Sequence, residues 1–284
     1  MAQLLKGAPV AEAIDARTAQ DVERLSQKGV TPKLAILRVG DKDSDLSYER
    51  GVSKRCAKLG VQVEVHALPA DVQQDELIAC IDALNADDSV HGVLMFRPLP
   101  RHLDQKAADA ALAPAKDVDG ITAGSLAGVF MGTGAGYTPC TAQACMEILA
   151  YYGIETAGKR AVVLGRSLVV GRPVACLLMA ANATVTVCHT KTADPAAIAR
   201  QADILICATG RMESVGADYI APEAVVLDVG ISWNADKGKL CGDADFDAIE
   251  PLCAAITPVP GGVGAVTNSV LVSHVVKAAL ATLD

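Results

Sequence analysis

The stretch RAVVLGRSLVVGRP at residues 160–173 is the part of the sequence that decides the fold class. The apolar run at 160–164 has the length and residue types of a buried strand, and Pro173 suits the first turn of a helix. Between them, Gly165, Ser167 and Gly171 form a turn of small residues, which lets the backbone approach a phosphate group at a helix N-terminus. This order predicts an α/β fold with a phosphate-binding turn, in which Ser167 stands where the usual dinucleotide fingerprint has its second glycine.

The same alternation of strands and helices continues beyond this turn. Strands are predicted at 184–187, 204–208 and 225–229, and helices are predicted to begin at Pro173 and Pro195. We therefore assign residues 141–266 to a Rossmann dinucleotide-binding domain, with Thr141 capping a helix that runs to about residue 152. Ligands of open α/β sheets bind at the carboxyl ends of the strands, so the further candidate cofactor-binding residues are His189, Thr190, Thr209, Gly210 and Ile231.

The choice between NAD and NADP depends on the end of the second strand of this domain. The segment Cys188-His189-Thr190-Lys191 contains no acidic residue to bind a ribose 2′-hydroxyl. Arg166 and Lys191 carry charges that can pair with a 2′-phosphate instead. The sequence favours NADP, with NAD as the alternative.

The first half of the chain predicts a second α/β domain. Helical patterns at 10–27, 46–59 and 75–84 alternate with β-branched runs at 34–39, 61–65 and 90–96. Periodicity fails between 113 and 141, where Gly and Pro are frequent and loops at a domain edge are expected. A final apolar helix is predicted at 269–283. The first domain is therefore assigned to residues 1–140 together with 267–284, and this domain is expected to hold the catalytic residues.

Composition and charge exclude several classes of function. The formal net charge is −8 and the Lys and Arg residues are scattered, which argues against a nucleic-acid partner. Lys6, Glu12 and Asp15 interrupt the N-terminal apolar residues, which argues against a signal peptide or membrane span and favours a cytoplasmic location. The nine cysteines lack a CxxC pair, so we expect reduced buried thiols and no metal site.

Several separate motifs match one family. They are Tyr48 in a predicted helix, PLP at 98–100, KDVDG at 116–120, TPCT at 138–141, GRSLVVGRP at 165–173 and TPVPGGVG at 257–264. Together, and in this order along nearly the whole chain, they resemble the methylenetetrahydrofolate dehydrogenase/methenyltetrahydrofolate cyclohydrolase family. KDVDG and PVPGGVG are far more specific than the glycine turn alone.

The resemblance implies an enzyme that oxidises 5,10-methylenetetrahydrofolate by hydride transfer to NAD(P). It also implies a homodimer of two-domain subunits, with folate bound between the domains and the final helix returning to the first domain. By the same resemblance, Gly165, Arg166, Ser167, Thr190 and Ile231 contact the dinucleotide. Tyr48 and Asp119 are the implied catalytic residues, and the implied substrate-binding residues are Tyr48, Pro98, Leu99, Asp119, Pro260, Gly261 and Gly262.

Two departures from the family pattern concern the cyclohydrolase reaction. Bifunctional members carry a lysine four residues after the tyrosine, where this chain has Val52, and a glutamine two residues before PLP, where it has Phe96. Cyclohydrolase chemistry must activate water and move protons, which Val and Phe side chains cannot do. We therefore predict a dehydrogenase with weak or absent cyclohydrolase activity, provided that the helix carrying Tyr48 does not rotate Lys54 or Arg50 into the site.

Three alternatives stay open from the sequence. The first is an ordinary bifunctional enzyme that also makes 10-formyltetrahydrofolate, with another group replacing the missing lysine. The second is a nicotinamide-dependent dehydrogenase acting on an amino or hydroxy acid. The third is a folate-binding protein that keeps the fold without the chemistry, since fold alone does not establish catalysis.

Overall fold

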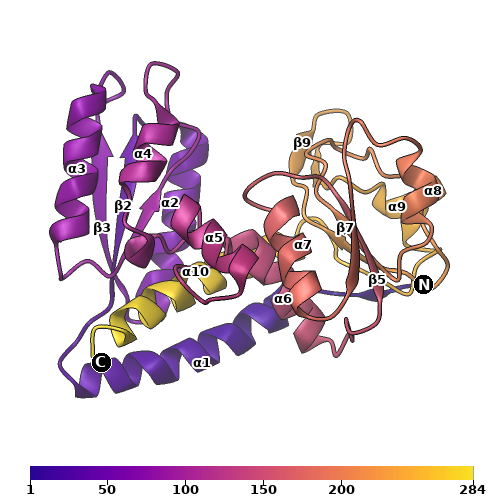
Figure 1. Cartoon of the computed structure of the whole chain (residues 1–284), viewed down its shortest axis with the longest axis horizontal. Coiled ribbons are helices and arrows are strands. Elements are labelled where there is room, and N and C mark those ends of the chain that lie inside the picture. Colours follow the sequence, from indigo (N-terminus) through magenta and orange to yellow (C-terminus); the bar gives the residue numbers. More distant parts are fainter. Residues whose placement is uncertain (284) are drawn as a thin grey trace. The chain divides into compact units, whose positions relative to one another are not determined.

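The computed structural model describes residues 1–283, which divide into two compact units. The six-stranded unit contains residues 1–12 and 141–267, and the three-stranded unit contains residues 13–140 and 268–283. Each unit contains a parallel sheet with helices (Figure 1). The predicted α/β fold class is confirmed.

The sheet of the six-stranded unit has the order β1-β11-β8-β7-β5-β6, and its neighbouring strands are all parallel. The strands are β1 (Gln3–Leu4), β5 (Arg160–Leu164), β6 (Thr184–Cys188), β7 (Ile204–Cys207), β8 (Val225–Asp228) and β11 (Ala255–Ile256). The central strands β5, β7 and β8 are almost entirely buried, as expected for a parallel sheet covered on both faces. Because β5 lies between β6 and β7, the chain reverses direction across the sheet at β5, which is where such sheets bind ligands.

The remaining elements of this unit are short. They are the helices α6 (Cys140–Tyr151), α7 (Gly171–Ala180), α8 (Pro195–Ala199) and α9 (Phe246–Ile249), the turn η2 (Ala217–Tyr219), and the antiparallel strands β9 (Ser232–Asn234) and β10 (Lys239–Cys241). Ala199 of α8 and Ile249 of α9 pack with buried side chains of β5, β7 and β8 in one core cluster, which includes Leu205 and Val226.

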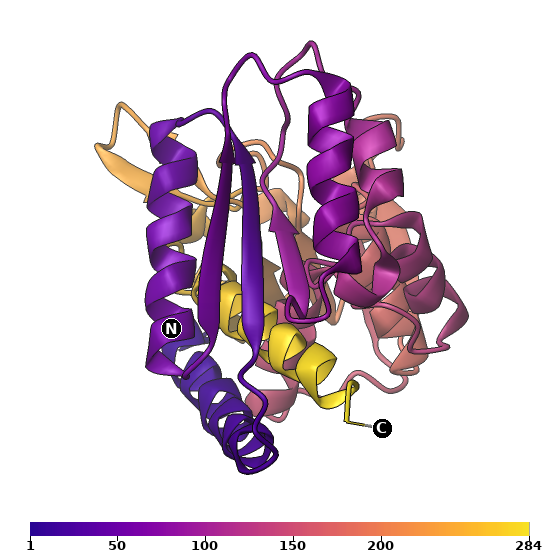
Figure 2. The ribbon, with the colours of Figure 1, turned by 90° about the vertical axis from the view of Figure 1, so that its left-hand side faces the viewer.

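The three-stranded unit is built on the parallel order β3-β2-β4. Its strands are β2 (Lys33–Val39), β3 (Gln62–Leu68) and β4 (Gly92–Met95), and its helices are α2 (Asp43–Lys58), α3 (Gln74–Ala86), α4 (Gln105–Ala111), η1 (Pro114–Lys116) and α5 (Ala123–Met131). Most of α1 (Gly7–Gln27) and of α10 (Val263–Leu280) also belongs to this unit. Figure 2 shows the three strands side by side, with α10, in yellow, behind them.

Several sequence-based boundaries differ from the structure. Helix α6 begins at Cys140, so Thr141 lies inside its first turn and the prediction of Thr141 as the cap is wrong. Helix α10 begins at Val263 and not at 269, because the glycines of PVPGGVG do not prevent a helix that is held by its buried apolar residues. The segment 113–141 contains α5, which begins at Ala123 and is capped by Thr122, whose hydroxyl accepts the Ser125 amide hydrogen.

The first twelve residues also differ from the predicted division. They were assigned to the first domain, whereas they cluster with the six-stranded unit. The reason is that β1 pairs in parallel with β11, with Gln3 opposite Ala255 and Leu4 opposite Ile256. No hydrophobic periodicity marks a strand of two residues, so this pairing has no local sequence signal.

Two further sequence expectations can be compared with the structure. All nine cysteines are free thiols, seven of them buried, with Cys80 and Cys176 half-buried. Helix α10 is long and apolar enough to span a membrane, but more than half of it is buried within the protein, as in the core helix of a globular domain.

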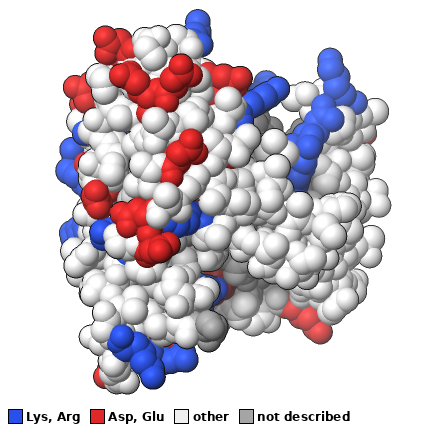
Figure 3. Space-filling model, turned by 60° about the vertical axis from the view of Figure 1, so that its left-hand side comes forward, with Lys and Arg blue, Asp and Glu red and all other residues white. Residues whose placement is uncertain are grey.

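On the face drawn in Figure 3, acidic and basic side chains form small separate groups and most of the surface is uncharged.

Asp15 on α1 is a buried carboxylate that pairs with two cations of α2 in the three-stranded unit. Its Oδ2 accepts hydrogen bonds from Arg55 at 2.6 Å and Lys58 at 3.0 Å. Burial alone would raise the pKa of Asp15, but these hydrogen bonds lower the pKa below its ordinary value. The ionised form is therefore favoured in the folded protein.

We expect Asp15→Asn to lower the free energy of unfolding at pH 7 by about 1–2 kcal/mol, because both partners lose a charged acceptor and Lys58 is largely exposed. The difference from wild type should disappear as pH falls below about 4, where Asp15 is protonated in the unfolded state and then in the folded state. Urea unfolding at several pH values measures this. Asp21→Asn, in an exposed pair with Arg24, is the control and should cost less than about 0.5 kcal/mol.

Candidate functional site

The glycine turn after β5 brings three stretches of backbone into contact. Gly165 has φ +129°, and a Cβ atom there would lie 2.0 Å from the carbonyl oxygen of Ala208 at the end of β7. A Cβ atom on Gly171 would lie 2.3 Å from the carbonyl oxygen of Gly165. Both positions therefore require glycine, for the close helix-to-strand packing that the dinucleotide turn needs.

Ser167 explains the departure from the usual glycine fingerprint. Its hydroxyl oxygen accepts hydrogen bonds from the backbone amides of Val170 at 3.1 Å and Gly171 at 3.3 Å. These amides lie at the N-terminus of α7, where helical donors otherwise lack partners. The serine thus caps α7, and its hydroxyl lies where the positive end of the helix dipole favours an anion.

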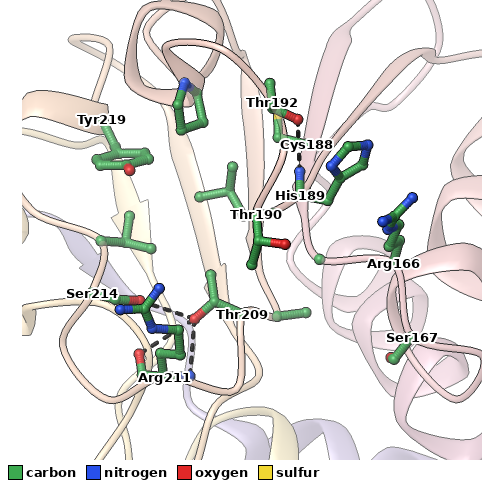
Figure 4. A pocket seen from close by; sticks show the side chains of 15 residues that line it. Arg166, Ser167, Cys188, His189, Thr190, Thr192, Thr209, Arg211, Ser214 and Tyr219 are labelled. Carbon is green, nitrogen blue, oxygen red and sulfur yellow. Dashed lines mark hydrogen bonds between the residues drawn. The ribbon is translucent and has the colours of Figure 1, made fainter.

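A cavity of about 490 Å³ lies over the carboxyl ends of β5, β6 and β7. Six of the nine predicted cofactor-binding residues line it, namely Gly165, Arg166, Ser167, His189, Thr190 and Thr209. Figure 4 shows Arg166 and Ser167 on one side of the cavity and Arg211 and Ser214 on the other, with Thr190 between them. The structure therefore brings most of the predicted set together at the strand ends where Rossmann sheets bind their ligands.

The other three predicted cofactor-binding residues do not line this cavity. Gly171 packs against the backbone of Gly165 and Arg166 in the turn. The amide of Gly210 donates to Asp243 Oδ2 at 2.9 Å. Ile231 is 62% exposed at the start of the β9 segment. Lys191, one of the two cations predicted to pair with a 2′-phosphate, is also absent from the cavity lining, whereas Arg166 belongs to it.

Sequence reasoning missed nine of the lining residues. They are Leu164, Cys188, Thr192, Pro195, Ala208, Arg211, Ser214, Val215 and Tyr219. Thr192 holds the end of β6, since its hydroxyl accepts the His189 amide hydrogen at 2.9 Å. Thr209 and Ser214 share a hydrogen bond of 3.0 Å across the loop after β7. Four of the nine lie at or beside a predicted strand or helix end, namely Leu164, Cys188, Pro195 and Ala208, whereas the other five lie in or after loops without a motif.

The KDVDG segment forms the second candidate site, in the three-stranded unit. Asp117 is fully buried, and its two carboxylate oxygens accept the amide hydrogens of Ile121 at 3.0 Å and Thr122 at 2.7 Å. Gly120 has φ +71°, and a Cβ atom there would lie 2.5 Å from the backbone of Tyr137 and Pro139. Lys116 donates to the Leu84 carbonyl at 2.8 Å. Lys116, Asp117 and Gly120 therefore hold the loop in place, whereas the Asp119 side chain is partly exposed.

Asp119 is half-buried beside one cation. Its Oδ2 lies 3.8 Å from Arg97 Nη2, and its side chain is 28% exposed. The pKa of Asp119 is raised to about 6, mainly by burial and also by Asp117, while Arg97 and a hydrogen bond with Cys140 oppose the rise. Asp119 is therefore mostly ionised at pH 7 and becomes protonated in mild acid, which is the range of a functional carboxyl group.

Tyr48, on α2, lies close to the carboxylate of Asp119. Its ring centroid is 5.4 Å from that of Phe96, and burial together with the negative charge of Asp119 raises the pKa of its hydroxyl. The hydroxyl therefore stays protonated at physiological pH. Tyr48 on α2, Phe96 after β4 and Asp119 of the KDVDG loop form one side-chain group, which we call the KDVDG-loop cluster.

The regular geometry of α2, the helix that carries Tyr48, determines the positions of Arg50 and Lys54. Helix α2 continues without a break from Asp43 to Lys58, so no irregularity rotates Lys54 or Arg50, and both are exposed. Val52 is completely buried. No lysine from the described part of α2 therefore replaces the one that the family pattern places at position 52.

The remaining predicted substrate-binding residues have different surroundings. Pro98 is exposed, whereas Leu99 is buried in the apolar core of the three-stranded unit, so packing accounts for Leu99. Pro260 and Gly261 are exposed in the six-stranded unit, and the Gly261 carbonyl accepts the Gly7 amide hydrogen at 2.7 Å. Gly262 is buried, with Pro258 too close for a side chain at position 262.

Comparison with known proteins identifies the family. Residues 5–119 match the tetrahydrofolate dehydrogenase/cyclohydrolase catalytic domain, and residues 139–283 match the NAD(P)-binding domain of the same family. The parallel six-stranded sheet with a cavity at its glycine turn defines a Rossmann-type dinucleotide-binding protein. The chain belongs to the tetrahydrofolate dehydrogenase/cyclohydrolase family, which confirms the resemblance found in the sequence.

Individual relatives cover essentially the whole chain. The bifunctional protein FolD of Carboxydothermus hydrogenoformans is 50% identical over 98% of this chain and 97% of its own length. The structure of the bifunctional enzyme FolD from Campylobacter jejuni has a TM-score of 0.96 at 37% identity and covers 99% of this chain and all of its own. The Trypanosoma brucei FolD structure, solved with NADP and an inhibitor, has a TM-score of 0.93 at 36% identity, covering 99% and 98%.

The Ser167 cap provides a test of the dinucleotide turn. Ser167→Ala leaves the Val170 and Gly171 amides without their acceptor, so we expect the KM for NADP to rise about fivefold, as for the loss of about 1 kcal/mol. Initial rates at varied NADP measure this. Asp104→Ala, which removes the cap of α4 in the three-stranded unit, is the control and should leave the KM for NADP within about twofold of wild type. Equal effects of the two variants would contradict a local role for Ser167.

Proposed function

We propose that this protein oxidises 5,10-methylenetetrahydrofolate to 5,10-methenyltetrahydrofolate by hydride transfer to NADP. The observation that carries the proposal is the presence, on one chain, of the glycine-turn cavity and of Asp119 presented by the KDVDG loop beside Tyr48. The family match over 5–119 and 139–283 supports it, as do relatives whose names state this activity.

The roles proposed for the KDVDG-loop cluster follow from the chemistry of its side chains. An ionised Asp119 accepts hydrogen bonds from the amide and amino groups of a pterin ring and so orients the ring. Tyr48, protonated and held near Phe96, offers an aromatic face to the pterin and lines the reacting carbon. Hydride departure needs alignment more than it needs a base, so positioning supplies much of the rate.

The dinucleotide is assigned to the cavity of the six-stranded unit. NADP, when bound, supplies the nicotinamide ring that accepts the hydride. The residues proposed to hold it are Gly165, Arg166, Ser167, Gly171, His189, Thr190, Thr209, Gly210 and Ile231. Support for NADP comes from the absence of an acid at the end of β6, from Arg166 in the cavity lining, and from the Trypanosoma brucei relative solved with NADP.

The wider setting is also a proposal. Residues 141–266, together with residues 1–12, which add a strand to the same sheet, are proposed as the dinucleotide domain, and residues 13–140 with 267–284 as the catalytic domain. A cytoplasmic homodimer that acts on tetrahydrofolate derivatives, without nucleic-acid or membrane partners, rests on the family resemblance and on the sequence.

The cyclohydrolase activity needs separate treatment. Relatives that are 46–50% identical are named bifunctional, which fits the bifunctional alternative better than the predicted loss of this activity. The proposal therefore includes hydrolysis to 10-formyltetrahydrofolate as the favoured second activity. One observation instead predicts that the cyclohydrolase activity is slow. Val52 is buried and Phe96 contacts Tyr48, and neither side chain can transfer protons. Asp119, with its pKa of about 6, is then the group proposed to move the proton.

A paired assay on the purified protein tests both activities. We expect reduction of NADP in the presence of methylenetetrahydrofolate, and loss of methenyltetrahydrofolate faster than the buffer-catalysed rate. Absence of the first activity contradicts the proposed function, whereas absence of the second alone supports the monofunctional interpretation.

The double variant Val52→Lys with Phe96→Gln sharpens this comparison. Restoring both polar groups should raise the cyclohydrolase rate by about 100-fold or more if proton transfer limits it, because general acid–base catalysis contributes that much. Val52→Leu, which keeps an apolar side chain, is the control. An unchanged rate in the double variant would show that another group already performs the proton transfer.

A further inference from the structure

Arg97 lies between the carboxyl groups of Asp109 and Asp119, at the edge of the KDVDG-loop cluster. It follows β4, between Phe96 and Pro98, and its side chain is only 19% exposed. Nη2 lies 3.8 Å from Asp119 Oδ2, and Nη1 lies 4.0 Å from Asp109 Oδ2 on α4. The guanidinium group thus joins the KDVDG loop to a helix that contains none of the proposed site residues.

The groups around Asp119 make Arg97 important for the ionisation of the Asp119 carboxyl group. The titratable groups that act on Asp119 are Arg97, Asp117, Cys140 and Tyr48. Asp117 is an anion, and Cys140 and Tyr48 are neutral when protonated, so among these four groups Arg97 alone carries a positive charge. Removing Arg97 would leave the carboxylates of Asp117 and Asp119 near each other without this positive charge. Because like charges disfavour ionisation, the pKa of Asp119 would rise.

Asp109 holds the other side of the guanidinium group. Its Oδ1 is buried without a hydrogen-bond partner, and its Oδ2 faces Arg97. Burial raises the pKa of Asp109 and Asp117 adds to the rise, whereas Arg97 and a hydrogen bond with Gln105 oppose it. Asp109 therefore restrains Arg97 on the side opposite to Asp119, and the three side chains form the row Asp109, Arg97, Asp119.

We propose that Arg97 is a positioning residue for substrate binding, which keeps the Asp119 carboxylate ionised and directed toward the pterin-binding side of the loop. This inference rests on the proposed function, because it takes Asp119 as the carboxylate that binds the pterin. Both distances exceed that of a hydrogen bond, so Arg97 acts through its charge and leaves the Asp119 oxygens able to accept from a ligand. An arginine does not deprotonate in this range, so Arg97 takes no part in proton transfer.

Arg97→Gln tests the proposal, because it keeps a polar side chain and removes the charge. We expect the KM for methylenetetrahydrofolate to rise about three- to tenfold, with the KM for NADP unchanged. The acid limb of the kcat/KM profile should move up by about one pH unit, because Asp119 then ionises less readily. Arg97→Lys keeps the charge and should return both parameters most of the way to wild type.

The matched control is Arg160→Gln in the six-stranded unit. Arg160 forms a more exposed arginine–carboxylate pair with Asp203 at 3.4 Å, outside the proposed sites, and its loss should leave the KM for methylenetetrahydrofolate and the pH profile unchanged. A purely structural role for Arg97 would lower thermal stability without moving the acid limb. That result, or an unmoved KM in Arg97→Gln, overturns the proposal.

A readout without turnover separates this inference from the proposed function. Carboxylate ¹³C NMR of wild-type protein and Arg97→Gln follows the titration of Asp119 directly, with Asp119→Asn used to assign its resonance. A higher Asp119 pKa in the variant supports the inference even if the wild type fails to oxidise methylenetetrahydrofolate, which would refute only the proposed function. An unchanged Asp119 pKa overturns the inference. If Arg97→Gln does not fold, Asp109→Asn is titrated in its place, and release of Arg97 toward Asp119 should lower the Asp119 pKa.

Discussion

The candidate folate site depends on one buried carboxylate that is not itself expected to touch the substrate. Asp117 accepts the amide hydrogens of Ile121 and Thr122, and in doing so it closes the KDVDG loop just before α5 begins. A buried carboxylate is stable only when such donors replace its water. The close packing at Gly120 then leaves no space for the loop to shift, so the position of Asp119 follows from contacts made by its neighbours.

The dinucleotide site depends on a similar arrangement of backbone. Gly165 and Gly171 let the turn after β5 approach β7 and α7, and Ser167 caps the helix that follows. The loops after β7 and β8 are held in turn by Asp228 and Asp243. Asp228 accepts three backbone amide hydrogens, and Asp243 accepts that of Gly210. In both units, buried carboxylates and glycines position the residues that face the ligand.

Local sequence predicted the parts of these sites that depend on local chemistry. The strand β5, the glycine turn and the first turn of α7 could be found because small residues and Pro173 have direct conformational consequences. Helix α5 was missed because its glycines conceal its apolar periodicity, and β1 was missed because its pairing partner lies about 250 residues away. Arg211, Ser214 and Tyr219 reach the cavity through the loop after β7, and the position of Arg97 between two aspartates requires α4 and the KDVDG loop to meet. Such contacts have no spacing rule in the sequence.

The most direct test of this account is the binding of tetrahydrofolate, measured by isothermal titration calorimetry between pH 5 and 8 for wild-type protein and Asp119→Asn. The account predicts that wild-type affinity falls as pH drops through about 6, approaching tenfold for each further pH unit, because protonated Asp119 loses its acceptor. The variant should bind weakly at every pH and show no such transition. Equal affinity of the two proteins across this range would contradict the assignment of Asp119 as the carboxylate that binds folate.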